Sequence, residues 1–217
     1  MEVVMCESIL RNSSLDNNET ILRNNHHLSV ELPLHPQSDT ELFRSLTPGE
    51  IKLAQTVFQN IIDYDRVKIY CHSSQSRMQP RVITTTKNGK VLLSVNEYRP
   101  DFSGDYTSHH DSVKYPHLFI FAMSFVWQYF RYDSSFRDPY TSSVWYSYKL
   151  DEPAFNFYTM EQQASIIADY WLLNKYDIVE YEELSNYQEY DKFGIDISKD
   201  LLMNYESMLR MHVQYIK

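Results

Sequence analysis

Helical periodicity of apolar residues is the clearest pattern along the chain, and it is strongest in the segment LTPGEIKLAQTVFQNIID. Apolar residues recur there every three or four positions from Leu53 to Ile62, which is the spacing of one buried helix face. Thr47 stands before this run as an N-cap, and Glu50 follows three residues later, where a capping box places its carboxylate. The pattern predicts a helix that begins just after Thr47.

Alternation of apolar and polar residues follows this helix and predicts strands. Val67, Ile69 and Cys71 alternate with polar residues, which is typical of a strand with one buried face. Two further β-rich runs flank the pair Asn88-Gly89, and Asn-Gly is a strong hairpin signal because both residues tolerate a positive φ. We therefore predict a small β-hairpin or sheet next to the first helix.

Three more helices are expected in the second half of the chain. The first runs from Pro116 to Tyr132, with proline at its first position. The second begins at Thr159, where Gln162 completes another capping box. The third spans Ser198 to Tyr215 and has leucines on one side. Helices packed on a small β-hairpin or sheet make this an α+β fold.

The chain divides into a polar N-terminal arm and one folded domain. Residues 1–42 are rich in Asn, Ser and Glu, as in RNSSLDNNET, and we expect them to be partly disordered. The remaining residues, 43–217, fit one domain, since domains usually contain about 100–200 residues.

Composition argues against several classes of ligand. The formal charge of −9 repels phosphate backbones, and no cluster of Lys and Arg offsets it, so we expect no nucleic-acid partner. With four glycines, the chain has little from which to build a phosphate-binding loop. Its two cysteines, Cys6 and Cys71, cannot form a thiolate metal site. We expect both to be free thiols, with a single disulfide as the alternative.

Neither a targeting segment nor a membrane span is expected. The first residues lack the positive charge and the cleavage site of a secretory signal. The most apolar window, Leu118 to Val126, is far shorter than the ~20 residues of a membrane-spanning helix. We therefore expect a cytoplasmic protein that does not insert into membranes.

Three segments, in the order of the predicted elements, carry a resemblance to a known family. They are LTPGEIKLAQTVFQNIIDYDRVKIY, YPHLFIFAMSFVWQYF and YTMEQQASIIADYW. Together they resemble the zincin-like metallopeptidase domains associated with Rhs and VgrG type VI secretion loci, over residues 46–176. The resemblance implies a zincin-like fold in which the helix that opens at Pro116 takes the place of the metal-binding helix.

The resemblance also implies that the metal site has degenerated. In that family the middle helix is similar to HLFIHEMTHVWQ, whose HExxH motif holds zinc through two His on one helix face and activates water through the Glu. The matching positions here are Phe121, Ala122 and Phe125, while Glu161 stands where the third ligand would be. Because a catalytic zinc needs about three protein ligands, we expect no metal, no cofactor and no peptidase activity.

Both features have a simpler interpretation as well. An apolar helix that ends in Trp-Gln can be an ordinary buried helix with no zincin ancestry. Glu161 is explained more simply as a first-turn carboxylate that complements the helix dipole than as a metal ligand.

A second candidate for metal chemistry is the triplet His109-His110-Asp111, with His117 nearby in sequence. We place the triplet in a polar loop. Adjacent His residues can chelate a metal ion, but a functional site also needs supporting ligands that the sequence does not identify. A solvated loop is therefore the favoured interpretation.

These observations lead to one functional hypothesis. The chain is a catalytically inactive zincin-like protein that binds another protein, as an immunity or accessory protein for a type VI secretion effector. Its partner would be a cognate toxin or a secretion component. The alternatives are a secreted effector and a metal-dependent hydrolase with a non-standard site. The acidic segment VEYEELSNYQEYDKF supplies the candidate partner-binding residues, which are Tyr181, Glu182, Glu183, Tyr187 and Tyr190.

Overall fold

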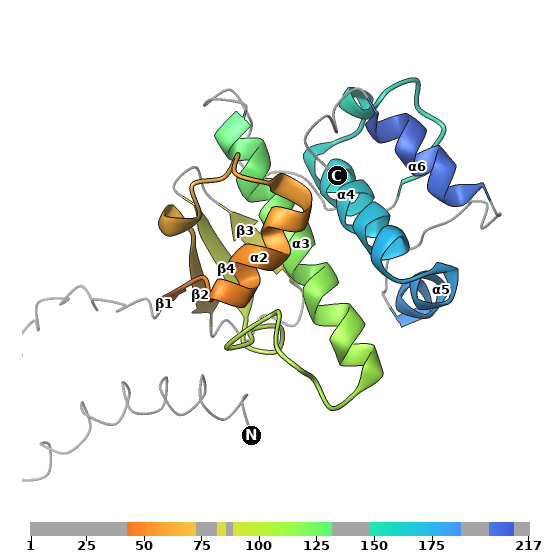
Figure 1. Cartoon of the computed structure of the whole chain (residues 1–217). Helices are drawn as coiled ribbons and strands as arrows, with labels where there is room; N and C mark the ends of the chain where they lie inside the picture. The colour runs from red at the N-terminus through yellow and green to blue at the C-terminus, as the bar shows by residue number, and fades with distance from the viewer. Residues whose placement is uncertain (1–42, 73–81, 86–88, 132–147, 188–199, 211–217) are drawn as a thin grey trace, which may run out of the picture.

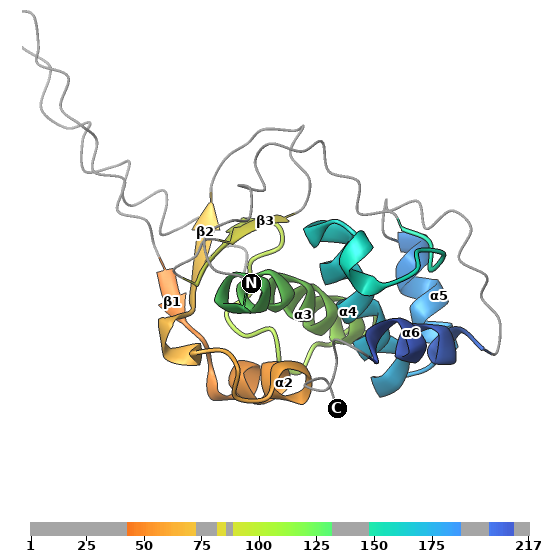
Figure 2. The same ribbon diagram turned by 90° about the horizontal axis from the view of Figure 1, so that it is seen from above.

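A small sheet and a set of helices pack on opposite sides of one long central helix, α3 (His109–Arg131), as Figures 1 and 2 show. The computed structural model describes residues 43–72, 82–85, 89–131, 148–187 and 200–210. The arrangement confirms the α+β class expected from the sequence. The predicted polar arm, residues 1–42, lies outside the described part of the chain.

The sheet has four strands in the order β1-β2-β4-β3. Its outer strands are β1 (Phe43–Ser45) and β3 (Val82–Thr85), and its inner strands are β2 (Lys68–His72) and β4 (Lys90–Ser94). β2 pairs with β4 in parallel, and the two outer strands pair antiparallel with their neighbours. The outer strand β1 comes from the chain before the first helix, which the alternation pattern alone did not predict.

The antiparallel pair of β3 and β4 confirms the hairpin predicted from Asn88-Gly89. Gly89 has a φ of 77°, in the left-handed region that glycine enters without strain. A Cβ at this position would also lie 3.0 Å from the carbonyl oxygen of Arg66. The glycine therefore serves both the turn and the close approach of the neighbouring chain.

Cys71, in β2, departs from the free thiol that we expected, because it is disulfide-bonded. The alternative of a single disulfide is therefore the one that the structure supports. The other cysteine of the sequence, Cys6, lies outside the described residues.

Helix α2 (Pro48–Phe58) begins with the predicted capping box and ends earlier than predicted, because Gln59 adopts a positive φ of 49°. The Glu50 carboxylate is fully buried. It accepts hydrogen bonds from the backbone N–H groups of Thr47 at 2.8 Å and Phe102 at 2.9 Å. Arg44 donates two more, at 2.7 and 2.8 Å, so this buried charge is paired and ties β1 and the 101–106 loop to α2.

Helix α3 begins at His109, seven residues before the predicted start at Pro116. Proline has no backbone N–H, so its place inside a helix removes the hydrogen bond to the carbonyl four residues earlier, which is that of Ser112. The Tyr176 hydroxyl donates to this carbonyl oxygen at 3.2 Å. A donor from elsewhere in the fold thus replaces the missing one, and the helix continues through the proline.

Two short 3-10 turns complete the helical elements of the described residues. The first, η1 (Tyr64–Arg66), comes just before β2, and the second, η3 (Phe155–Phe157), comes just before α4. α4 (Met160–Lys175) has the predicted Thr159 capping box. α5 (Ile178–Tyr187) was not predicted as a helix, and α6 (Leu201–Leu209) lies within the predicted last helix.

The core surrounds α3 and is rich in aromatic side chains. Phe119 of α3 stacks on Phe102 with ring centroids 5.8 Å apart, and Trp127 lies 6.3 Å from Phe58 of α2. Both faces of α3 are buried, because α2 and the sheet cover one side and α4 covers the other. Among the described residues, none of the helices is long and apolar enough to cross a membrane.

Candidate functional site

The positions that the resemblance assigns to the metal-binding motif of α3 are apolar and buried. Phe121, Ala122 and Phe125 are 5%, 2% and 3% exposed. The two phenyl rings meet edge to face, with centroids 5.2 Å apart and planes at 89°. This is a favoured aromatic geometry, so the pair contributes to packing and offers no atom that could bind a metal.

Glu161 lies in the first turn of α4, two residues after the Thr159 cap, and is half-buried. This location fits the first-turn role that we considered simpler than metal binding. Within the described parts of the chain, no three His, Cys, Asp or Glu side chains gather as a metal ion would require.

Gln128 joins the C-terminal half of α3 to the start of α4. Its amide nitrogen donates to the Met160 carbonyl at 3.1 Å and to the Gln163 side-chain oxygen at 3.2 Å. The Gln163 amide in turn donates to the Tyr158 carbonyl at 2.9 Å. Because Gln128 is fully buried, these bonds set the register of the two helices where the resemblance places a metal site.

The structure corrects the placement of the triplet His109-His110-Asp111. It forms the first turn of α3 rather than a loop, and the Ser108 hydroxyl accepts a hydrogen bond from the Asp111 N–H at 3.4 Å. His109 is exposed and lies 3.4 Å from the Glu180 carboxylate of α5. His117 is buried and lies two turns further along α3, so the rise of the helix puts about 10 Å between it and the triplet.

His117 belongs to a buried polar network that the sequence did not reveal. Its Nε2 lies 2.8 Å from Oδ1 of Asp169 in α4, and Oδ2 of Asp169 accepts a 2.5 Å hydrogen bond from the Tyr148 hydroxyl. The Tyr148 hydroxyl also bonds to that of Tyr205 in α6, which lies 3.1 Å from the Tyr181 hydroxyl of α5. Five side chains, each no more than 5% exposed, thus link α3 to α4, α5 and α6.

The groups of this network serve as hydrogen-bond partners within the core. Burial first, and then the negative charge of Asp169, raise the pKa of Tyr148 and Tyr205 well above the usual value for tyrosine. Burial also raises the pKa of Tyr181. The phenols therefore stay protonated and act as hydrogen-bond donors near neutral pH. A substrate would have no access to these groups, because all of them are enclosed.

One signal in the sequence could have located the network. Asp169 interrupts the apolar run SIIADYWLL, and a carboxylate on a buried helix face needs partners. Its direct partners, His117 and Tyr148, and the two tyrosines beyond them are distant in sequence, so this signal points to Asp169 but not to Tyr148, Tyr181 or Tyr205.

The predicted partner-binding residues do not form one surface. Tyr181 is 1% exposed and bonded to Tyr205, so its assignment to a binding surface is wrong. Glu182 and Glu183 are exposed on α5. The side chain of Tyr187 and the whole of Tyr190 lie outside the described residues.

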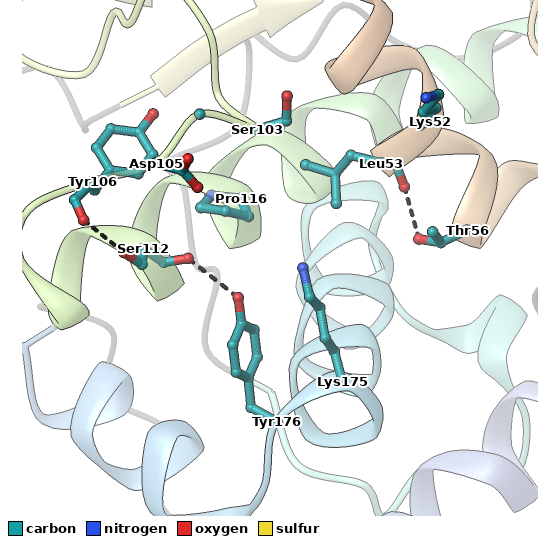
Figure 3. A pocket seen from close by; sticks show the side chains of 11 residues that line it. Lys52, Leu53, Thr56, Ser103, Asp105, Tyr106, Ser112, Pro116, Lys175 and Tyr176 are labelled. Atoms are coloured by element: carbon teal, nitrogen blue, oxygen red, sulfur yellow. Dashed lines mark hydrogen bonds between the residues drawn. The ribbon is translucent and has the colours of Figure 1, made fainter.

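A pocket of about 410 Å³ opens beside the Pro116 region of α3, between α2, the 101–106 loop and the end of α4. Figure 3 shows Lys175 extending from α4 into this pocket, with Pro116 and Tyr176 beside it. The loop lies close to α2 because Gly49 has no side chain, and a Cβ there would be 2.1 Å from Oγ of Ser103. Sequence analysis did not identify this pocket.

Comparisons with known proteins give a limited likeness. No protein-family model matches the chain, and no curated protein matches it. Among solved structures, the effector domain of Pseudomonas aeruginosa VgrG2b is similar, with a TM-score of 0.49 and 20% sequence identity. The similarity covers 82% of this chain and 87% of that one. A likeness of this degree establishes neither a shared fold nor a shared activity.

Proposed function

We propose that this chain is a catalytically inactive zincin-like protein that acts by binding another protein, as an immunity or accessory protein of a bacterial type VI secretion effector. The observation that carries the proposal is the buried edge-to-face pair of Phe121 and Phe125. These rings occupy the positions that the sequence resemblance assigns to the two zinc-binding imidazoles. A helix filled in this way keeps its shape and lacks metal chemistry, which favours recognition over catalysis.

The exposed side of α5 is the surface that we assign to the partner. Val179 is 53% exposed, and Ile178, Glu182 and Glu183 are exposed beside it. Apolar area with a charged rim is typical of protein interfaces. The chain's net charge of −9 would speed association with a basic partner surface.

Co-expression tests this function directly. The chain should be harmless when expressed alone in bacteria, and it should restore growth when expressed with its cognate secretion effector, with which it should co-purify. The double substitution Glu182→Lys and Glu183→Lys should weaken rescue, because it reverses the charge of the proposed surface. Asp151→Lys with Glu152→Lys is the matched control, since both residues are exposed elsewhere.

Two outcomes would contradict the proposal. Toxicity of the chain expressed alone would favour the secreted-effector alternative. Equal loss of rescue in the α5 variant and in its control would remove the assignment of the binding surface to α5.

A further inference from the structure

We propose that the pocket between α2 and the end of α4 binds a small organic carboxylate, with Lys175 as the cation that pairs with it. The inference is independent of the proposed function, because Phe121 and Phe125 do not line this pocket. It would remain valid if no protein partner were found, and it can fail while the proposed function holds.

The size and walls of the pocket suit a small molecule with an apolar body. Its volume of about 410 Å³ falls within the range of about 300–1,000 Å³ that is typical of ligand pockets. Leu53, Pro116 and the rings of Tyr106 and Tyr176 supply apolar surface around it, as Figure 3 shows. Such a lining can enclose a short aliphatic or aromatic group.

The charges around the pocket favour an anion. Lys52 and Lys175 line it together with one acidic residue, Asp105, so the lining carries a surplus of positive charge. The chain as a whole carries −9, which makes this surplus a local feature of the fold rather than a property of the composition.

Lys175 is the strongest candidate for contact with the ligand. Among the described residues its ammonium group has cation-π contacts, 4.9 Å from the Trp171 ring centroid and 5.2 Å from that of Tyr176, and no ion pair is found for it. Partial desolvation of its ammonium group lowers the pKa of Lys175, although the residue as a whole is exposed. A bound carboxylate would replace the lost hydration and offset this cost.

The hydroxyl groups of the pocket hold its walls in place. The Tyr176 hydroxyl donates to the Ser112 carbonyl at 3.2 Å, and the Ser112 hydroxyl donates to the Ser108 carbonyl at 3.0 Å. The other hydroxyls of the lining, on Thr56, Ser103 and Tyr106, also donate within the protein. Among the side chains of the lining, the lysines therefore remain as the donors for an anion. Asp105 and the lack of arginine in the lining favour a monoanion over a phosphate group, which usually recruits several donors.

Ligand-observed NMR with benzoate, and with benzamide as its neutral isostere, tests the site on the full chain. Benzoate should bind saturably and at least tenfold more tightly than benzamide. Lys175→Met keeps the side-chain length and removes the charge, so it should weaken benzoate binding at least tenfold. Lys149→Met, at an exposed lysine outside the pocket, is the matched control and should leave binding unchanged.

A second variant keeps the proposal testable if Lys175→Met fails to fold. Asp105 is exposed and lines the pocket, so Asp105→Asn removes a repulsive charge at little structural risk. It should tighten benzoate binding by about two- to fivefold, as expected for a screened surface charge. Absence of saturable binding, equal binding of benzamide, or unchanged benzoate affinity in either pocket variant would overturn the proposal.

Discussion

At the residue scale, Phe121 and Phe125 decide what α3 can bind. Phenyl rings provide no lone pair for a metal ion, and their edge-to-face contact adds about 0.5–1.5 kcal/mol beyond the burial of their surface. Ala122, next to Phe121 in the chain, is 2% exposed and has only a methyl side chain. Replacing these side chains with metal ligands would therefore remove the aromatic contact that they now make.

Restoring the motif tests whether these positions are a degenerate site. Wild-type protein grown with zinc should contain less than about a tenth of an equivalent, since three protein ligands are needed. The triple substitution Phe121→His, Ala122→Glu and Phe125→His should raise zinc content towards one equivalent, with Glu161 as the third ligand. Mass spectrometry of metal in untagged protein gives the measurement.

The control for this variant has similar polarity and no strong ligands. It carries Phe121→Asn, Ala122→Gln and Phe125→Asn, and it should bind no more zinc than the wild type. Near-stoichiometric zinc in the wild type would contradict the inactive-site hypothesis. Failure of the His-Glu-His variant alone, in folded form, would favour the ordinary buried helix with no zincin ancestry.

At the element scale, the continuity of α3 depends on a residue that follows α4. Pro116 leaves the Ser112 carbonyl without its usual N–H donor, and Tyr176 supplies a hydroxyl instead. The contact also fixes the end of α4 beside α3, so one hydrogen bond both repairs a helix and positions a neighbour.

A double-mutant cycle measures this repair. Tyr176→Phe should lower the free energy of unfolding by about 1 kcal/mol, because it removes the hydroxyl and leaves a backbone acceptor unpaired. In a Pro116→Ala background the restored N–H can bond to Ser112, so the same change should cost less than about half as much. Urea unfolding gives both values, and equal costs in the two backgrounds would contradict the replacement of one donor by the other.

At the scale of the whole molecule, a buried network connects helices that are distant in sequence. Its members are His117, Asp169, Tyr148, Tyr181 and Tyr205. Four helices and residue 148 contribute one side chain each. Since every member is buried and bonded, the network fixes one arrangement of α3, α4, α5 and α6.

The raised pKa values of its tyrosines predict how stability depends on pH. Tyr148, Tyr181 and Tyr205 stay protonated in the folded protein above the pH of about 10 at which unfolded tyrosine ionises. Above that pH the folded state binds more protons than the unfolded state, so stability that is complete below it declines as pH rises. The decline is up to about 1.4 kcal/mol per pH unit for each tyrosine.

Denaturant unfolding between pH 8 and 11 measures this dependence, with Tyr205→Phe as the comparison. The variant should be less stable at pH 8 by about 1–2 kcal/mol, because it loses the hydroxyl that joins two other tyrosines. Its stability should also fall less steeply above pH 10, since one buried phenol is gone. An unchanged slope would mean that Tyr205 does not contribute to the pH dependence.

The sequence by itself determined those elements that are stabilised by interactions between residues close together in the chain. The capping boxes at Thr47 and Thr159 and the glycine at position 89 fixed two helix starts and one hairpin, because each satisfies its own neighbouring backbone. The apolar face of the first helix followed from periodicity in the same way.

Tertiary structure alone decided the features whose partners are distant in sequence. The carbonyl that Pro116 leaves unpaired in α3 finds its donor in Tyr176, and the buried Tyr181 hydroxyl finds its partner in Tyr205. The pocket around Lys175 exists because α2, a loop and two helices meet there. Periodicity indicates which face of an element is buried. It does not indicate which side chain of another element will contact that face, and these features consist of such contacts.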